Sequence, residues 1–404
     1  MSFLKKLHRL VEMPAFHVLL ALSAAHCLND LLQSVITAVY PMLKEDLGLS
    51  FGQIGLITLV YQLAASIFQP VVGYAFDRRP FVGSLPAGMC CTAAGILMFA
   101  FCSTLPGILA AVFMVGIGSA TLHPEASRIT SLAGHERRGF AQSVFQVGGN
   151  FGGSIGPLLV AVIVAPHGRR YVAFFLIFAA LCFWAMTPIC RWYGRYLREL
   201  RTAENSSESS VSLPLSKRRT IFVIAVIILL IFSKYIYMAS LSSYYTFYLI
   251  DRFGVSVSQS QIFLFVFVVS TAIGTLVGGP VGDRYGRKAV IWISILGTAP
   301  FSLLMPHVGL ALTVVLSFCA GFMLSSAFPA ILLYAQELLP TKLGMISGLF
   351  FGFAFGVGGI ASAVLGSLAD SYGIEAVYNF CAYTPLLGVV AAFLPDLRAR
   401  RAGN

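Results

Sequence analysis

The sequence predicts an all-α integral membrane protein, and three observations lead to that class. Hydrophobic residues make up 58% of the 404 positions and charged residues only 11%, against roughly 25% charged residues in a soluble domain. The apolar residues gather in twelve continuous stretches, each near the ~20 residues that a helix needs to cross a bilayer core. The stretches are apolar throughout rather than alternating, which favours helices. We expect membrane helices at 16–40, 53–76, 82–101, 105–129, 139–164, 171–192, 221–250, 260–282, 289–305, 309–333, 344–368 and 376–394.

The formal net charge of +11 is explained by topology. With both termini placed in the cytoplasm, almost all of the 27 lysines and arginines fall in loops on the cytoplasmic side. Loops predicted to face outside contain only Lys44, Arg169, Arg170 and Arg252. This asymmetry follows the positive-inside rule. The basic residues therefore predict a membrane orientation, and no nucleic-acid partner is expected.

A polar segment divides the chain nearly in half. Its Ser/Glu-rich composition predicts a flexible cytoplasmic linker at 193–219, between six-helix bundles at 1–192 and 220–404. The bundles look like repeats, because Gly116–Pro124 matches Gly321–Pro329 at an offset of 205 residues. In repeat-built transporters the substrate site lies between the repeats near the bilayer midplane, and we expect the same here.

The first predicted helix carries an acidic residue near its middle. An ionised side chain at that depth costs about 2.5–3.5 kcal/mol on insertion scales, so its presence indicates a function. Spacing places Asp30 on one helical face with His26, Asn29 and Gln33. We expect this face to line a water-filled cavity, although a structural hydrogen-bond cluster is the alternative. Asp30 is then a candidate proton carrier, and the other three are candidate substrate contacts.

The fourth predicted helix contains the sequence His123-Pro-Glu125-Ala-Ser-Arg128. Glu125 and Arg128 are three residues apart and can pair on one helix face. A pair that only anchors the helix end is the simpler interpretation. We favour a role in gating or proton relay and count His123, Glu125 and Arg128 with Asp30 as proton-coupling candidates.

The fifth predicted helix combines amides with many glycines. The glycines allow neighbouring helices to approach closely. Gln146 and Asn150 recur four residues apart on this helix. They either line the cavity or bond a neighbouring helix, and we include both among the candidate substrate contacts.

The seventh predicted helix contains a lysine. At 100° per residue, Lys234 shares a narrow stripe with Tyr237, Tyr245 and Tyr248. Tyrosines near the outer end of a helix can also belong to an interfacial aromatic belt. We favour a pocket wall, in which Lys234 attracts an anionic group and the tyrosines supply hydroxyl groups and ring faces.

Two predicted loops carry related motifs. Residues 279–288 read Gly-Pro-Val-Gly-Asp-Arg-Tyr-Gly-Arg-Lys, and a degenerate copy lies at 73–79. This turn between two membrane helices resembles the loop signature of the major facilitator superfamily. The resemblance implies the major facilitator fold, with one motif in each half and a cytoplasmic latch. The latch residues that it implies are Asp77, Arg78, Asp283, Arg284 and Arg287, with Glu337 pairing with Arg287.

Longer blocks make the resemblance more specific. They are 25–34, 123–128, 145–152, 232–249, 334–340 and 348–359. In these blocks the chain resembles drug:proton antiporters of the same superfamily that export phosphonate antibiotics. That resemblance implies a secondary transporter of the bacterial inner membrane, which exports a small anionic drug such as fosmidomycin in exchange for protons by alternating access. We expect a monomer without cofactor or metal.

One departure from the exporter pattern affects proton coupling. Such exporters carry an arginine in the fourth helix, four residues before a Gly-x-Gly, where this chain has Val112. Proton handling is therefore expected at Asp30 or Glu125.

Two alternatives to an exporter have to be considered. A proton-coupled importer of a small organic or phosphorylated metabolite anion would use the same lysine. An intramembrane enzyme is not expected, because His26/Asp30 and His123/Glu125 show no third converging ligand or nucleophile in the sequence.

Overall fold

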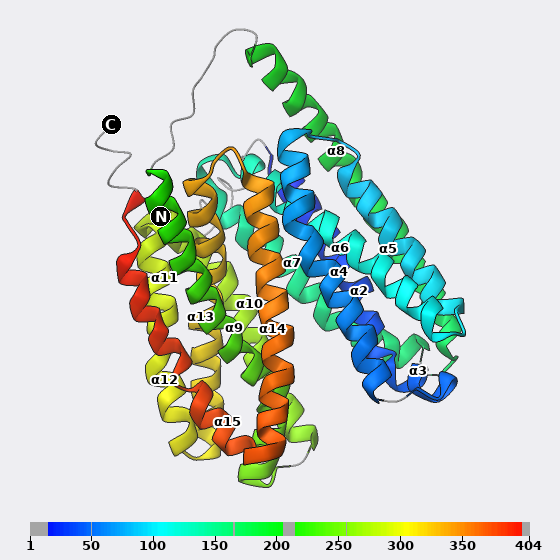
Figure 1. The fold of residues 1–404 in the computed structure, drawn as a ribbon, viewed down its shortest axis with the longest axis vertical. Helices are drawn as coiled ribbons and strands as arrows, with labels where there is room; N and C mark the ends of the chain where they lie inside the picture. The colour runs from blue at the N-terminus through cyan, green and yellow to red at the C-terminus, as the bar shows by residue number, and fades with distance from the viewer. Residues whose placement is uncertain (1–14, 50, 165, 205–214, 256, 398–404) are drawn as a thin grey trace, which may run out of the picture. The chain divides into compact units, whose positions relative to one another are not determined.

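The computed structural model describes residues 15–49, 51–164, 166–204, 215–255 and 257–397. Within these ranges the chain is helical and contains no strand (Figure 1). The prediction of an all-α membrane protein is confirmed. Both the basic N-terminal residues and the Ser/Glu-rich core of the predicted linker lie outside the described ranges.

The described residues form two compact units. The first combines those within Met1–Val211 with Thr341–Gly352, and the second combines those within Ser212–Pro340 with those within Phe353–Asn404. One long helix, α14 (Leu343–Tyr372), is therefore shared, and its first residues pack in the first unit.

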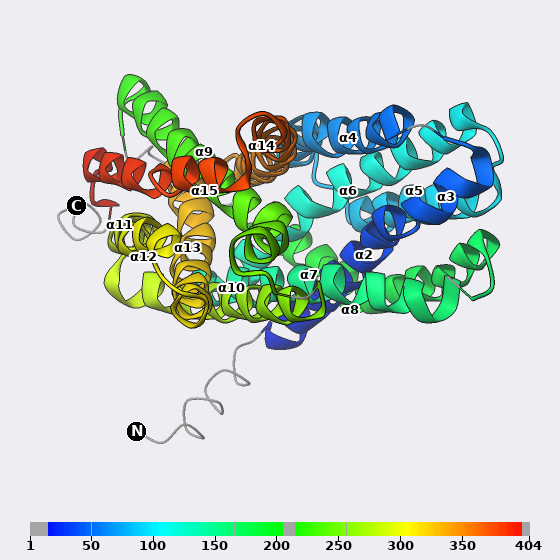
Figure 2. The ribbon, with the colours of Figure 1, turned by 90° about the horizontal axis from the view of Figure 1, so that it is seen from below.

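The first unit contains a set of long helices joined by short turns, and α5 and α6 lie side by side in it (Figure 2). α8 continues past the predicted membrane span into the first part of the predicted linker. The elements are α2 (Phe16–Ala38), α3 (Tyr40–Leu47), α4 (Phe51–Arg78), α5 (Ser84–Phe101), α6 (Leu105–Ala133), η1 (His135–Arg137), α7 (Arg138–Leu159), η2 (Val160–Val164), η3 (Arg169–Phe175) and α8 (Leu176–Glu204).

Two of the predicted spans in the second unit are divided into shorter helical elements. The predicted ninth span is interrupted near Gly297, and the predicted twelfth passes from α-helix into a 3₁₀-helix. Its elements, besides the rest of α14, are α9 (Lys217–Phe253), α10 (Val257–Tyr285), α11 (Arg287–Leu296), α12 (Ala299–Leu304), η4 (Met305–His307), α13 (Leu310–Leu338), α15 (Ile374–Cys381) and η5 (Thr384–Phe393).

Eleven helical stretches in the described ranges are long and apolar enough to cross a membrane. The predicted span at 139–164 is not among these stretches of the described residues. It is nevertheless continuous in the structure as α7 followed by one π-helical turn, η2.

Glycines set the distance between α2 and α7. A Cβ atom added at Gly152 would lie 1.9 Å from the backbone oxygen of Cys27, and one at Gly148 would lie 2.1 Å from that of Ser23. The two helices therefore touch backbone to backbone along this face, as small residues permit in membranes. The polar residues of α2 are positioned by this contact.

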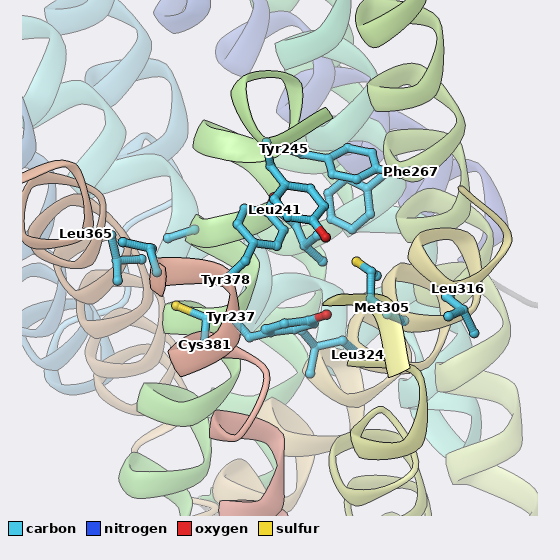
Figure 3. Packing of buried hydrophobic residues seen from close by; sticks show 14 of the residues in the cluster. Tyr237, Leu241, Tyr245, Phe267, Met305, Leu316, Leu324, Leu365, Tyr378 and Cys381 are labelled. Carbon is cyan, nitrogen blue, oxygen red and sulfur yellow. The ribbon is translucent and has the colours of Figure 1, made fainter. Parts of the chain in front are cut away.

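Tyrosines fill much of the core of the second unit (Figure 3). Tyr245 packs with Phe267 at 6.5 Å between ring centroids, and its hydroxyl donates a hydrogen bond to Ser317 Oγ at 3.0 Å. Tyr248 stacks on Tyr378 at 4.1 Å. These rings give the unit a stiff centre around α9.

The α2–α7 contact can be tested with two neighbouring glycines. Gly152→Ala should lower the unfolding free energy by about 1–3 kcal/mol, because the new methyl group overlaps the α2 backbone. Gly153→Ala adds the same methyl group on the same helix where nothing lies within 4 Å. Thermal unfolding of the purified variants should show a lower midpoint for Gly152→Ala alone. Equal midpoints would contradict the packing described.

Candidate functional site

Polar side chains gather on one face of α2 because they are spaced three or four residues apart along the helix. His26 and Asn29 are buried, and Asp30, with 21% of its side chain exposed, is more open than they are. Asn29 Nδ2 donates a hydrogen bond to Asp30 Oδ1 at 3.1 Å. The prediction that these side chains share one face of α2 fits these contacts, and Gln33 lies one turn further along.

Two imidazole side chains meet at Asp30. His26 Nε2, from the preceding turn of α2, lies 3.2 Å from Asp30 Oδ2. His123 Nε2, from α6, lies 3.2 Å from Asp30 Oδ1. Each carboxylate oxygen therefore faces one imidazole, and we call His26, Asp30 and His123 the triad.

Backbone carbonyl groups fix the orientation of both imidazoles. His26 Nδ1 lies 2.8 Å from the oxygen of Phe145, and His123 Nδ1 lies 3.0 Å from the oxygen of Ser119. A carbonyl oxygen only accepts hydrogen bonds, so both Nδ1 atoms must carry hydrogen. Each Nε2–carboxylate contact then needs a further proton, on either partner, to be attractive. The triad can thus hold up to two such protons, with a net charge of +1 when both are present and 0 after one has left.

Neighbouring residues hold the triad in place. The Phe145 ring stacks on His26 at 4.1 Å between centroids, and Phe351 packs 5.6 Å from His123. A Cβ atom at Gly149 would lie 2.4 Å from His26 Nε2, so this glycine leaves the room that the imidazole occupies.

A second hydrogen-bond network adjoins the triad through Ser119. Its hydroxyl donates to Gln33 Oε1 at 3.1 Å, and the Tyr61 hydroxyl donates to the same oxygen. Within the described part of the chain, Gln33 Nε2 and Asn29 Oδ1 are buried without a hydrogen-bond partner. One donor and one acceptor on this side of α2 are therefore buried without a described partner, which is uncommon in folded proteins.

The expectation that His26 and Asp30 lack a third converging group is wrong. His123 comes from a helix far along the chain, and periodicity within one helix gives no sign of such a contact. The three groups lie within 4.8 Å of one another, a spacing that a metal ion also accepts. At 3.2 Å each imidazole Nε2 lies within ion-pair distance of one Asp30 carboxylate oxygen.

Glu125 and Arg128 lie apart from the triad contacts as a buried pair. Arg128 donates to both carboxylate oxygens of Glu125 at 2.8 Å, and it also contacts the Tyr193 hydroxyl. Ser84 donates to Glu125 Oε1 at 3.2 Å. The predicted pairing is present, and its bidentate geometry satisfies both charges.

Asp77, a predicted latch residue, caps a helix. Its two oxygens accept hydrogen bonds from the backbone N–H groups of Gly344 at 2.9 Å and Met345 at 2.8 Å, at the start of α14. An acidic side chain there is stabilised by the helix dipole. Arg128 Nε lies 3.9 Å from Asp77 Oδ1, and Arg78 lies 4.7 Å over the Tyr74 ring.

The corresponding residues of the second unit form an ion-pair chain. Arg287 Nη2 lies 2.7 Å from Asp283 Oδ1, and Arg287 Nε lies 3.7 Å from Glu337 Oε1. The predicted contact between Arg287 and Glu337 is therefore present. Arg284 points over the Tyr285 ring at 5.2 Å.

Lys234 is a buried cation without an acidic partner among the described residues. Only 3% of its surface is exposed, and its Nζ lies 5.1 Å from the Tyr235 ring centroid and 4.9 Å from that of Phe328. Aromatic faces attract a cation by only about 0.5–2 kcal/mol. A charge held this way inside a membrane protein is available to an anion.

The other predicted substrate contacts have different surroundings. Tyr237, Tyr245 and Tyr248 belong to the packed core of the second unit, and Figure 3 shows Tyr237 and Tyr245 within it. Gln146 and Asn150 are half-buried on α7, and neither side chain forms a hydrogen bond within the described ranges. The sequence analysis did not single out Tyr61, Ser119, Tyr235 or Phe328. Tyr61, Ser119 and Phe328 lie on helices other than those that carry Asp30 and Lys234, and Tyr235 follows Lys234 on α9 but lies outside the stripe of the other tyrosines.

The fold and these sites define a class of protein. The sequence matches the family described as Major Facilitator Superfamily over residues 22–257 and 227–404, and the chain belongs to that family. It is thus a multi-pass membrane transporter of small molecules and not an enzyme. The fucose transporter FucP, solved in an outward conformation, shares the fold with a TM-score of 0.74 at 18% identity, covering 93% of this chain and 98% of that one.

Two relatives of known sequence make the comparison more specific than the family match. The chain is 51% identical to the Fosmidomycin resistance protein of Escherichia coli (strain K12) over 384 residues, which is 95% of this chain and 94% of the relative. It is 38% identical to YfnC, an uncharacterized transporter of the same superfamily from Bacillus subtilis (strain 168), over 94% of this chain and 93% of the relative. The predicted resemblance to the major facilitator superfamily is confirmed, and the match to a fosmidomycin resistance protein agrees with the more specific resemblance of the sequence blocks.

The buried pair on α6 can be tested by removing each charge. Glu125→Gln removes the bidentate carboxylate partner of Arg128, leaving Asp77 at 3.9 Å as its nearest acid among the described residues, and should lower the unfolding free energy by up to about 3–5 kcal/mol. The double variant Glu125→Gln/Arg128→Gln should cost less than the two single changes together. Arg252 and Glu375, an exposed pair with 25% and 50% of their side chains accessible, provide the control.

In that control, Glu375→Gln should cost about 1 kcal/mol or less, because water screens the charges. Thermal or denaturant unfolding in detergent measures all four variants. Additive effects of the two changes on α6 would show that the pair is not energetically coupled.

Proposed function

We propose that this transporter exports a small anionic drug, a fosmidomycin-like phosphonate, in exchange for protons. The observation that carries the proposal is the triad. In it, two imidazoles face one carboxylate that is partly accessible to solvent, and each imidazole is also held by a backbone carbonyl oxygen. The name of the relative at 51% identity supports the substrate.

The triad is the proposed proton carrier. Protons reach it through Asp30, since this is the one member with an exposed edge. A substrate lying over that edge would remove the water that stabilises the net positive, fully loaded form, because transferring charge out of water is unfavourable. Substrate binding would therefore expel a proton, and proton uptake from outside would in turn favour substrate release.

His26 changes role in this proposal. The sequence places it among substrate contacts, but its 3.2 Å contact with Asp30 makes it a second imidazole of the proton site. Asn29 and Gln33, with their free polar atoms, remain the proposed substrate contacts on α2, together with Gln146 and Asn150 on α7. Glu125 and Arg128 are proposed to stabilise one conformation rather than to carry the transported proton.

Lys234 is the proposed anion contact of the second unit. Its ammonium group has no carboxylate competitor among the described residues, and ring faces hold it in place. A phosphonate would supply the missing negative charge. The core packing of Tyr237, Tyr245 and Tyr248 would hold α9 in position and thereby fix the place of Lys234.

The remaining features of the proposal concern topology. We place the transporter as a monomer in a bacterial inner membrane with both termini in the cytoplasm, as the asymmetry of basic residues indicates. Bundles at 1–192 and 220–404 would alternate access. The contacts of Asp77 and Arg78, and of Asp283, Arg284, Arg287 and Glu337, would latch the cytoplasmic side.

Transport in inverted membrane vesicles tests the substrate and the direction. With an acidic interior, wild-type vesicles should accumulate fosmidomycin, and accumulation should collapse when the gradient is dissipated. Lys234→Ala should reduce accumulation at least tenfold, because loss of an anion-binding contact worth about 1.4 kcal/mol lowers affinity tenfold. Arg219→Ala, which removes an exposed cation from the same helix, should leave it unchanged.

Three outcomes would count against the proposal. Accumulation that is equal with and without a gradient would exclude proton coupling. Uptake only into right-side-out vesicles with an acidic exterior would favour the importer of metabolite anions. Equal losses for Lys234→Ala and Arg219→Ala would remove Lys234 from the substrate site.

A further inference from the structure

A basic groove lies on the first unit, away from the triad. It has a volume of about 650 Å³ and is lined by His17 of α2 and by Pro188, Cys190, Arg191, Gly194, Arg195 and Arg198 of α8. Gly194 has no side chain, so the groove can run close to the α8 backbone. None of the described residues that line it is acidic.

The arginines of the groove share one face of α8. They follow one another at intervals of four and three residues, which is the spacing of neighbours along a helix surface. Arg191 and Arg195 are exposed, and no described carboxylate pairs with either. Arg191 and Arg195 therefore contribute two positive charges that no described acidic residue balances.

The same face of α8 is apolar on the membrane side of the arginines. Ile177, Leu181 and Trp184 continue the same spacing backwards along the helix, and they are 51%, 47% and 77% exposed. On an adjoining face, the Trp192 and Tyr196 rings stack at 5.4 Å between centroids. Aromatic side chains at this depth are typical of the membrane–water interface.

We propose that this groove binds the phosphate headgroup of an anionic phospholipid. Arg191 and Arg195 would hold the phosphate oxygens through paired N–H groups, and one acyl chain would lie along Ile177, Leu181 and Trp184. Basic pockets beside membrane helices on the cytoplasmic side bind such headgroups, and α8 ends on the side predicted to be cytoplasmic. The lipid would hold the end of α8 at a fixed depth in the membrane.

The N-terminal residues of the chain are a poor alternative occupant. The first 14 residues contain Lys5, Lys6 and Arg9 against one acid, Glu12. A positively charged segment does not complement three arginines. The apolar continuation of the groove also favours a ligand that is charged at one end and hydrocarbon at the other.

Native mass spectrometry of the full-length protein tests the proposal. The delipidated protein is titrated with phosphatidylglycerol or, separately, with zwitterionic phosphatidylcholine of the same chain length. Wild type should bind phosphatidylglycerol more tightly than phosphatidylcholine. The double variant Arg191→Gln/Arg195→Gln should bind its tightest phosphatidylglycerol molecule at least tenfold more weakly than wild type does. Arg218→Gln/Arg219→Gln, which removes two exposed arginines at the start of α9, is the matched control.

The control variant should bind phosphatidylglycerol as wild type does. Glycerol phosphate, which offers the same phosphate without acyl chains, should fail to displace the lipid. Equal losses in both double variants, or equal binding of the two lipids by wild type, would overturn the proposal. So would displacement by glycerol phosphate, or a second copy of the chain occupying the site, seen as a dimer that only Arg191→Gln/Arg195→Gln releases.

Discussion

A charged group inside a membrane protein has to be compensated by other protein groups, and this constraint explains the sites of the transporter. Two imidazoles face Asp30, Glu125 pairs with Arg128, and the start of α14 caps Asp77. Lys234 alone among these has ring faces in place of a carboxylate. Glu125 and Asp77 have hydrogen-bond partners for both carboxylate oxygens, whereas we propose that the triad and Lys234 change their charge state or accept a ligand.

The internal repeat relates the triad of the first unit to Lys234 of the second. At the offset of 205 residues, Asp30 corresponds to Tyr235, His123 to Phe328 and Asn29 to Lys234. Asp30 contacts His123 in the first unit, and Tyr235 packs against Phe328 at 6.2 Å in the second. The same pair of helix positions therefore holds an acid–imidazole contact in one repeat and, in the other, two aromatic rings that pack against Lys234. Duplication followed by divergence of side chains accounts for both.

Much of the architecture could be predicted from composition and periodicity, since a membrane leaves helices as the only option for such apolar spans. The contact of Arg128 with Glu125 was also predicted, from their spacing on one helix face, and that of Arg287 with Glu337 was predicted as part of the cytoplasmic latch. The convergence of His123 on Asp30 could not be predicted, because helical spacing says nothing about which helices meet. For the same reason, Tyr237, Tyr245 and Tyr248 read as a pocket wall although they pack against other helices.

The central claim is that substrate and proton exclude each other at the triad. It is tested most directly by adding fosmidomycin to the purified transporter in weak buffer while a pH indicator follows the protons. The account predicts proton release by wild type, and none by Asp30→Asn under conditions where calorimetry shows that this variant still binds substrate. Proton uptake on binding, as direct attraction between an anion and the loaded triad would produce, would contradict antiport. Undiminished release by Asp30→Asn would show that another residue carries the proton.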